Sequence, residues 1–147
     1  MLSVFDSLRL SGQALSVQKT RLDVASANLA NAQTTRTEDG GPYRRRDVVV
    51  HDEVARGQFD FFLDDAMNSV RSVRVDGVTE DRAPPRLVYR PDHPDADASG
   101  YVAMPNINTI EEMVNMITTM RSYQANLNVT SGIRQMAERA LNIGRSI

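Results

Sequence analysis

The chain has 147 residues, 41% of them hydrophobic, and contains neither tryptophan nor cysteine, which fits one domain with a small core. Its 17 basic and 19 acidic side chains leave a net charge of -2, which argues against dedicated nucleic-acid binding or an anionic membrane surface. Without cysteine, disulfides and thiol catalysis are excluded. No run approaches the roughly 18 apolar residues of a membrane span, and no pattern typical of a cleaved Sec signal peptide is found.

Residues 1–35 predict an N-terminal helix. Four leucines recur every seven residues along it: Leu8, Leu15, Leu22 and Leu29. This spacing favours supercoiling against a second helix, and because the flanking residues are small or polar, the stripe is too narrow to hold alone. Near the end, Asn28 and Asn31 share one face, where asparagine is unfavourable unless its amide is bonded. A fraying helix end is the alternative interpretation.

Residues 36–107 predict a small antiparallel β domain with long loops. In three runs apolar and polar residues alternate and β-branched residues occur: Arg46–Val50, Val70–Val78 and Arg86–Arg90. Turns rich in glycine and proline bound them, and the pair Asp76-Gly77 predicts a hairpin turn or a bulge. The segment Phe59 to Asp65 holds three of the four phenylalanines and fits a short helix, a strand or an inserted loop.

Residues 108–147 predict a second long helix. Pro105 excludes helix just before it, Thr109 and Glu112 have the spacing of a capping box, and Gly144 is the expected stop. Six residues follow alternating steps of three and four: Ile110, Met113, Ile117, Met120, Gln124 and Leu127. This is the heptad seam of a coiled coil, although a core-facing helix of a bundle fits the spacing equally well.

The segment Asp95–Gly100 resembles the opening of an EF-hand calcium loop, with oxygen ligands at alternate positions and glycine at the sixth. However, Asn106 stands where the loop needs glutamate, and Pro105 blocks the helix that should follow. A match without its flanking helices is usually false. A calcium-responsive module is therefore a minor alternative, and we expect no metal site.

Other polar clusters also have simple interpretations. The run Arg44, Arg45 and Arg46 fits an exposed strand edge or a subunit contact better than a phosphate patch. His51 and Asp52 are neighbours in a predicted strand, so their side chains point to opposite faces. No nucleophile, phosphate loop or carboxylate pair stands out. We expect no enzyme activity, no catalytic residue and no cofactor.

Several motifs resemble those of the bacterial flagellar axial proteins, which are the rod, hook and hook-associated proteins. One is the Asn-Leu-Ala-Asn-Ala box that begins at Asn28. Five more follow in the same order as in that family, most of all as in its proximal rod members: Asp39–Arg44, Pro85–Pro91, Gly100–Asn106, Glu112–Val114 and Arg121–Asn126. The resemblance covers nearly the whole chain.

The elements predict an α+β fold in which long N- and C-terminal helices form a coiled-coil-like pair and a small antiparallel β domain is inserted between them. By the resemblance, residues 1–35 and 108–147 are axial helices and 36–107 the β domain. The resemblance implies a structural subunit of the flagellar basal-body rod that transmits torque in the periplasm. It also implies export through the flagellar type III apparatus without a cleaved signal peptide, and contacts with other copies of itself and with neighbouring rod proteins.

In that family the terminal helices bind neighbouring subunits. Carried over to this sequence, the assembly residues would be Leu8, Leu15, Leu22, Asn28, Leu29, Asn31, Met113, Ile117, Met120, Tyr123, Gln124 and Leu127. Composition alone would equally allow a cytoplasmic coiled-coil adaptor or an export chaperone.

Overall fold

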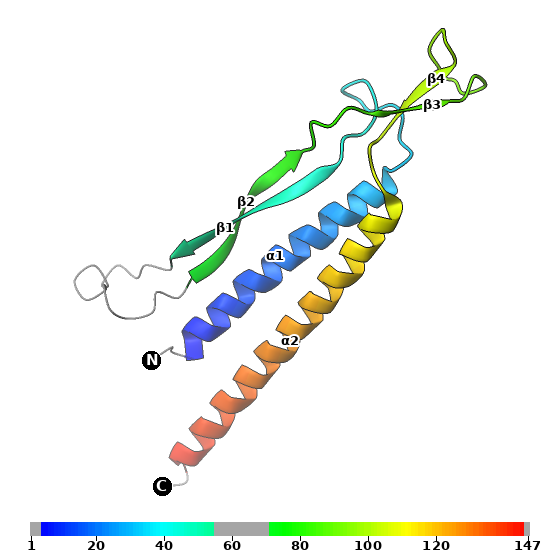
Figure 1. Ribbon diagram of the computed structural model, residues 1–147. Coiled ribbons are helices and arrows are strands. Elements are labelled where there is room, and N and C mark those ends of the chain that lie inside the picture. Colours follow the sequence, from blue (N-terminus) through cyan, green and yellow to red (C-terminus); the bar gives the residue numbers. More distant parts are fainter. Residues whose placement is uncertain (1–3, 55–70, 146–147) are drawn as a thin grey trace. The chain divides into compact units, whose positions relative to one another are not determined.

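The computed structural model describes residues 4–54 and 71–145 (Figure 1). In chain order the elements are helix α1 (Val4–Ala30), strands β1 (Arg46–Val54), β2 (Arg71–Glu80), β3 (Arg86–Tyr89) and β4 (Tyr101–Met104), and helix α2 (Thr109–Arg145). Strand β1 pairs with β2 and β3 with β4, which gives two separate two-stranded sheets. The expected α+β fold with long terminal helices is confirmed. The segment Phe59 to Asp65 lies outside the described residues.

The strands differ from the sequence prediction in two ways. Strand β4 was missed, because Tyr101–Met104 is a short run without polar alternation and only its pairing with β3 identifies it. Of the two alternatives at Asp76-Gly77, the hairpin turn is wrong, since both residues lie inside β2, and the bulge stays a prediction. Gly77 does not have a positive φ, so its backbone continues as ordinary strand instead of turning.

Residues distant in the sequence come together in two compact units. One combines the described residues of Met1–Lys19, Val50–Asp76 and Met120–Ile147, and the other combines Thr20–Val49 with Gly77–Thr119. The second unit therefore holds the last turns of α1, the antiparallel β3–β4 ribbon and the first turns of α2. The division at 35 and 107 that the sequence predicts stays a prediction.

Helix α2 begins differently from the expected capping box. The side-chain Oδ1 of Asn108 accepts a hydrogen bond of 3.1 Å from the Ile110 N–H, so Asn108 is the N-cap. The Glu112 carboxylate does not close a box, because it binds Arg45 and Asn28 instead. At the other end α2 continues to Arg145, one residue past the expected stop at Gly144.

The two faces of α2 differ in polarity. Buried or half-buried positions recur at steps of three and four: Glu112, Met116, Thr119, Tyr123, Asn126, Thr130, Ile133 and Ala137. Most of these in the first five turns are polar. The apolar side chains of the predicted seam are exposed instead: Ile110 71%, Met113 47%, Ile117 49%, Met120 48% and Leu127 42%. A core-facing role for that seam within the described residues is therefore wrong.

The heptad leucines of helix α1 are only partly buried. All four heptad leucines are half-buried, whereas the buried residues of α1 are Val17, Ala25 and Asn28. Neither helix, over its described residues, is long and apolar enough to cross a membrane.

Gly100 precedes β4 and has a φ of 79°, a conformation that costs an L-residue about 1–2 kcal/mol. A Cβ there would also lie 2.9 Å from Cε2 of Tyr89. Gly100→Ala should therefore lower the free energy of unfolding by at least about 1–2 kcal/mol, measured by urea denaturation. Gly77→Ala is the control, because its Cβ would meet nothing within 4 Å. Equal effects of the two substitutions would contradict this reading of Gly100.

Candidate functional site: a buried polar junction and an exposed apolar stripe

The last turn of α1 buries an asparagine that joins three parts of the second unit. The Asn28 side chain is 1% exposed. Its Oδ1 accepts hydrogen bonds from the Arg46 N–H at 2.9 Å and from the Tyr43 hydroxyl at 3.2 Å. Its Nδ2 donates to the Arg46 carbonyl oxygen at 2.8 Å and to Glu112 Oε2 at 3.4 Å. Both acceptor positions and both donors of the amide are thus used.

The geometry explains why the chain tolerates asparagine inside a helix. Asn28 bonds both backbone groups of Arg46 as an adjacent strand would, just where β1 begins. Asn28 thereby supplies a partner to each of these two backbone groups at the start of the strand. The sequence expectation that something bonds Asn28 is borne out, and the fraying alternative does not hold at this position.

A partly buried ion pair adjoins the amide. The Arg45 Nε donates to Glu112 Oε1 at 2.7 Å, and Glu112 is only 3% exposed. Burial opposes the charge of Arg45, but the hydrogen bond and the attraction of Glu112 outweigh it and raise the pKa of the guanidinium above its usual value. Asp47 lies 3.4 Å from the same guanidinium and is largely exposed. The carboxylate of Glu112 is therefore compensated from two sides, by Arg45 and by Asn28.

The three successive arginines have different surroundings. Arg45 joins the junction, whereas the Arg46 guanidinium lies 5.5 Å from the centroid of the Tyr43 ring and 3.2 Å from Glu80. Arg44 is exposed. Because alternate side chains of an extended chain point to opposite faces, they do not form one basic patch.

Burial raises the pKa of the Tyr43 hydroxyl above its usual value of 10.0; the charge of Arg46 opposes this rise, and Glu80 and Glu112 add to it. The folded state thus holds this proton more tightly than the unfolded chain. The stability that Tyr43 contributes is fully present below about pH 10 and falls as the pH rises through the folded pKa. The free energy of unfolding should therefore fall less on the alkaline side in Tyr43→Phe than in the parent chain. A free energy of unfolding that falls as steeply with pH in Tyr43→Phe as in the parent chain would contradict the assignment.

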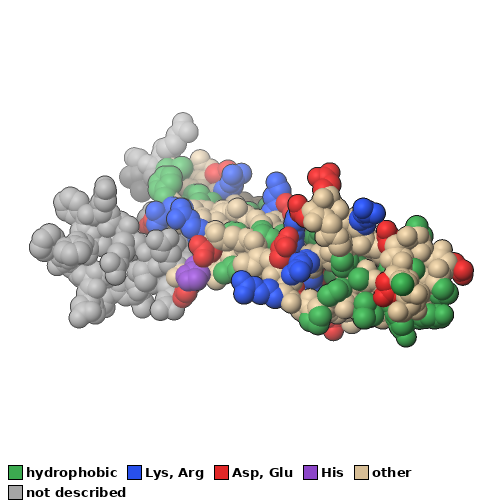
Figure 2. Space-filling view, turned by 90° about the horizontal axis from the view of Figure 1, so that it is seen from above, with side chains coloured by type: hydrophobic (Ala, Val, Ile, Leu, Met, Phe, Trp, Pro, Cys, Tyr) green, Lys and Arg blue, Asp and Glu red, His purple; other side chains and the backbone are tan. Residues whose placement is uncertain are grey.

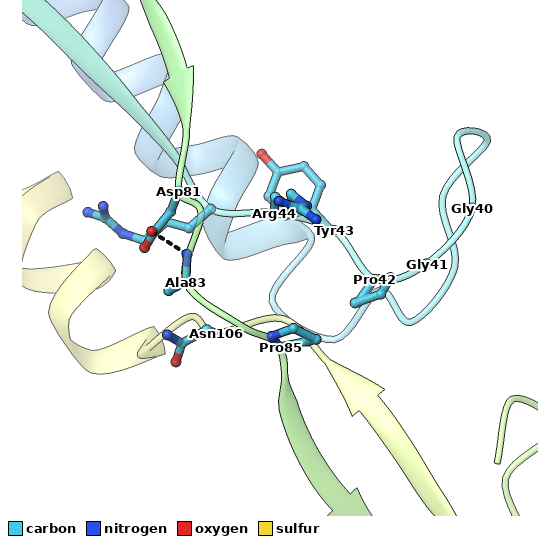
Figure 3. A pocket seen from close by; sticks show the side chains of 10 residues that line it. Gly40, Gly41, Pro42, Tyr43, Arg44, Asp81, Ala83, Pro85 and Asn106 are labelled. Atoms are coloured by element: carbon cyan, nitrogen blue, oxygen red, sulfur yellow. Dashed lines mark hydrogen bonds between the residues drawn. The ribbon is translucent and has the colours of Figure 1, made fainter. Parts of the chain in front are cut away.

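A pocket of about 130 Å³ opens beside the junction and is lined by the loop Gly40–Arg45 together with Asp81, Ala83, Pro85 and Asn106. Figure 3 shows the Asp81 carboxylate accepting a hydrogen bond from the Ala83 N–H, at 2.9 Å. Its lining has no nucleophile with an adjacent base. Within 4–54 and 71–145, no three His, Cys, Asp or Glu side chains are grouped so that they could hold a metal ion.

The acidic side chains of the loop that resembles an EF-hand are engaged in turns. Asp97 Oδ1 accepts from the N–H groups of Ser99 and Tyr101 at 2.8 and 2.9 Å, and Asp95 Oδ2 accepts from the Thr35 hydroxyl at 2.7 Å. These bonds hold the loop as a local turn. The geometry gives the calcium alternative no support.

The twelve expected assembly residues fall into three groups. Asn28 faces inward, and Asn31 bonds its own helix and turn through the Ala27 carbonyl and the Thr34 hydroxyl. Side chains that are half-buried are Leu8, Leu15, Leu22, Leu29 and Tyr123, and exposed ones are Met113, Ile117, Met120, Gln124 and Leu127.

Sequence reasoning missed the junction itself. Tyr43 and Arg45 were not singled out for it, and Glu112 was assigned to the helix cap. The available signal was that Glu112 stands on the face of α2 opposite the apolar stripe, where an acid without a local partner needs one from elsewhere in the chain.

Both ends of the chain match models of flagellar proteins. Residues 8–36 match the family described as "Flagella basal body rod protein", and residues 98–143 match "Flagellar basal body rod FlgEFG protein C-terminal". These matches cover most of α1 and nearly all of α2. They define the class as flagellar basal-body rod proteins.

Relatives along the whole length define the member of that class. The flagellar basal-body rod protein FlgC of Salmonella typhimurium is 41% identical over 99% of this chain and 98% of its own. FlgC of Bacillus subtilis is 39% identical over 98% of this chain and all of its own, and FlgC of Borreliella burgdorferi is 39% identical over 97% and 98%. The chain belongs to the FlgC family of flagellar basal-body rod proteins.

Proposed function

We propose that the chain is a structural subunit of the flagellar basal-body rod, that it assembles through its terminal helices and that it transmits torque. The observation that carries this is the exposed apolar stripe of α2 in a chain that matches FlgC proteins over nearly its full length. A helix that shows its apolar side to solvent and its polar side to its own chain is suited to pack against other molecules.

Helix α2 should gain most of its stability when subunits assemble. Each apolar side chain of the stripe that moves from water into a packed seam contributes roughly 1.5–3 kcal/mol. In the single chain the inward positions of the first five turns of α2 are mostly polar, so packing supports this part of the helix only weakly. Neighbouring subunits would supply the missing contacts, from other copies of the chain and from other rod proteins.

Torque transmission requires many clamped interfaces and no chemical turnover. The buried carboxylate of Glu112 is paired with the partly exposed Arg45, so this ion pair has a structural role within the described part of the chain. Location in the periplasmic rod and export by the flagellar type III apparatus are part of the same proposal, and they rest on membership of the FlgC family.

The test is a substitution in the leucine heptad. Leu22 is half-buried, so in the single chain an arginine there can extend its head group to water. In an assembled seam the same arginine would be an unpaired buried charge, which costs several kcal/mol. In a flagellated bacterium that lacks its own FlgC, cells with Leu22→Arg should make soluble protein but lack completed rods and not swim.

Arg21→Glu is the matched control, one position away at an exposed side chain, and should swim almost as the parent does. Electron microscopy of isolated basal bodies separates a missing rod from a stalled motor. If Leu22→Arg cells swim normally, the α1 seam is not an assembly surface. If the parent chain neither enters basal bodies nor restores swimming, a role as adaptor or export chaperone becomes the better explanation.

A further inference from the structure

A repeat of seven residues leaves the register of the two helices open, that is, which residue of α2 lies beside which residue of α1. In α1 the leucines recur every seven residues, at Leu8, Leu15, Leu22 and Leu29. Buried and half-buried positions of α2 also have counterparts seven residues later: Glu112 and Thr119, Met116 and Tyr123, Thr119 and Asn126, Tyr123 and Thr130, Asn126 and Ile133, Thr130 and Ala137. If α2 slipped by one heptad, each of these positions would be taken by another of the same row.

Packing around the start of α2 does little to exclude such a slip. An open cavity of about 280 Å³ lies beside the junction, lined by the last turns of α1, the first residues of β1 and the first turns of α2, all in the second unit. Apart from Glu112, its lining from α2 is small and polar: Asn115, Thr118 and Thr119. Side chains that border a space of this size do not interlock, so they do not specify one position of the helix.

The two helix ends beside this cavity run in opposite directions. Asn28 of α1 bonds Glu112 of α2. Arg21, one heptad before Asn28, lines the same cavity as Thr119, one heptad after Glu112. A slip of seven residues is a movement of about 10 Å along the axis. In one direction it brings Thr119 to the place of Glu112, and in the other it would bring Pro105, which a helix interior excludes.

The carboxylate of Glu112 distinguishes the two registers. Of the α2 positions in the repeating row, Glu112 alone carries a charge. It is 3% exposed, and it accepts hydrogen bonds from Arg45 Nε at 2.7 Å and from Asn28 Nδ2 at 3.4 Å. A slip would separate the carboxylate from both partners and leave a threonine hydroxyl beside the guanidinium. Separating the partners of a buried ion pair is strongly unfavourable, so the slipped register is disfavoured.

Charges at the surface do not discriminate in this way. Figure 2 shows basic and acidic side chains interspersed over the described surface. Exposed pairs such as Arg46 with Glu80 contribute little to stability, because water and other charges replace either partner. A buried carboxylate has no such substitutes, so it accepts only the register in which its own partners are within reach.

We propose that Glu112 fixes the register of α2 against α1 and β1, with Arg45 and Asn28 as the partners that read its position. A single buried polar side chain sets the register of coiled coils in the same way. The register also determines at which level α2 presents its apolar stripe. The inference goes beyond the proposed function, because it concerns the fold of one chain.

The distance between two spin labels tests the register, because the chain has no cysteine of its own. The labels would be attached to Ala30→Cys at the end of α1 and to Thr118→Cys in α2, both at exposed positions. Thr118 lies six residues after Glu112, so a slip that brings Thr119 to the place of Glu112 moves the second label toward the first. The purified full chain with these labels should give one distance by double electron–electron resonance.

Two variants of the labelled chain should change this result. Arg45→Met with Glu112→Leu replaces the ion pair by apolar side chains, which often preserves or raises stability. A second, shorter distance should then appear beside that of the parent, as expected from a slip of about 10 Å. Moving the acid by one heptad, with Glu112→Thr and Thr119→Glu, should raise the share of the shorter distance further, because the carboxylate then reaches Arg45 only after the slip.

Arg46→Met with Glu80→Gln is the matched control. It removes an exposed ion pair next to the junction and should keep the single distance of the parent. Circular dichroism of each sample measures its helix content. If both junction variants keep their helices and the single parent distance, other contacts fix the register and the inference is wrong. Loss of the helices in both variants would overturn it as well, because the slipped register would then not be the competing state.

Discussion

Replacing Asn28 by alanine should lower the free energy of unfolding of the second unit by about 2–4 kcal/mol. The substitution removes the side-chain amide that bonds both the N–H and the carbonyl of Arg46 at the start of β1, and each buried polar group left unpaired costs about 1–3 kcal/mol. It also removes one acceptor of the Tyr43 hydroxyl and one donor to Glu112. The better helix propensity of alanine, below about 1 kcal/mol, does not offset this.

Urea denaturation of Asn28→Ala measures the loss in free energy of unfolding, and hydrogen exchange shows which backbone groups lose their partners. The Arg46 amide proton should be protected in the parent chain and exchange rapidly in Asn28→Ala. Asn31→Ala is the control, because the Asn31 amide donates to the Ala27 carbonyl of its own helix, and it should cost less than about 1 kcal/mol. Unchanged protection of the Arg46 amide in Asn28→Ala would show that another group satisfies it.

Replacing Arg45 by methionine should cost about 3–5 kcal/mol, because it leaves the Glu112 carboxylate buried without its ion-pair partner. The reverse substitution, Glu112→Gln, should cost less, about 1–2 kcal/mol. The reason is that Arg45 remains partly exposed and keeps Asp47 at 3.4 Å. The double variant should be more stable than Arg45→Met alone, because it no longer contains a buried unpaired charge.

A double-mutant cycle in urea measures this coupling. Arg46→Met is the matched control one position along the chain. Its ion pair with Glu80 is exposed on both sides, 48% and 52%, and such pairs contribute about 1 kcal/mol or less. If Arg45→Met lowered the free energy of unfolding no more than Arg46→Met does, water would have to reach the carboxylate of Glu112. The junction would then not exclude solvent.

The α2 stripe shows how far sequence reasoning reached into the candidate site. The alternation of three and four in Ile110, Met113 and Ile117 predicted one apolar face of a helix, and the structure contains that helix. Whether the face packs inside the chain or faces outward depends on what α1 and β1 offer to the opposite side. Periodicity cannot decide this, since it describes one helix and not its neighbours.

What the sequence by itself determined is local. Heptad spacing predicted two long helices, proline and glycine predicted most of the turns, and the absence of cysteine and of grouped nucleophiles and bases argued against chemistry. The motifs near Asn28 and in Glu112–Val114 indicated the class, because they occur in the same order along this chain as in the flagellar axial proteins. None of these signals needed knowledge of which segments meet.

The tertiary structure decided the rest. Asn28 and Glu112 are 84 residues apart in the chain and bond each other at 3.4 Å, and Arg45 completes the group at 2.7 Å. Burying a carboxylate and an amide is favourable only where several partners from different segments converge. Strand β4 is likewise defined by its pairing with β3. Such convergence is a property of the folded chain, which is why the junction and the outward direction of the apolar stripe were visible only in the structure.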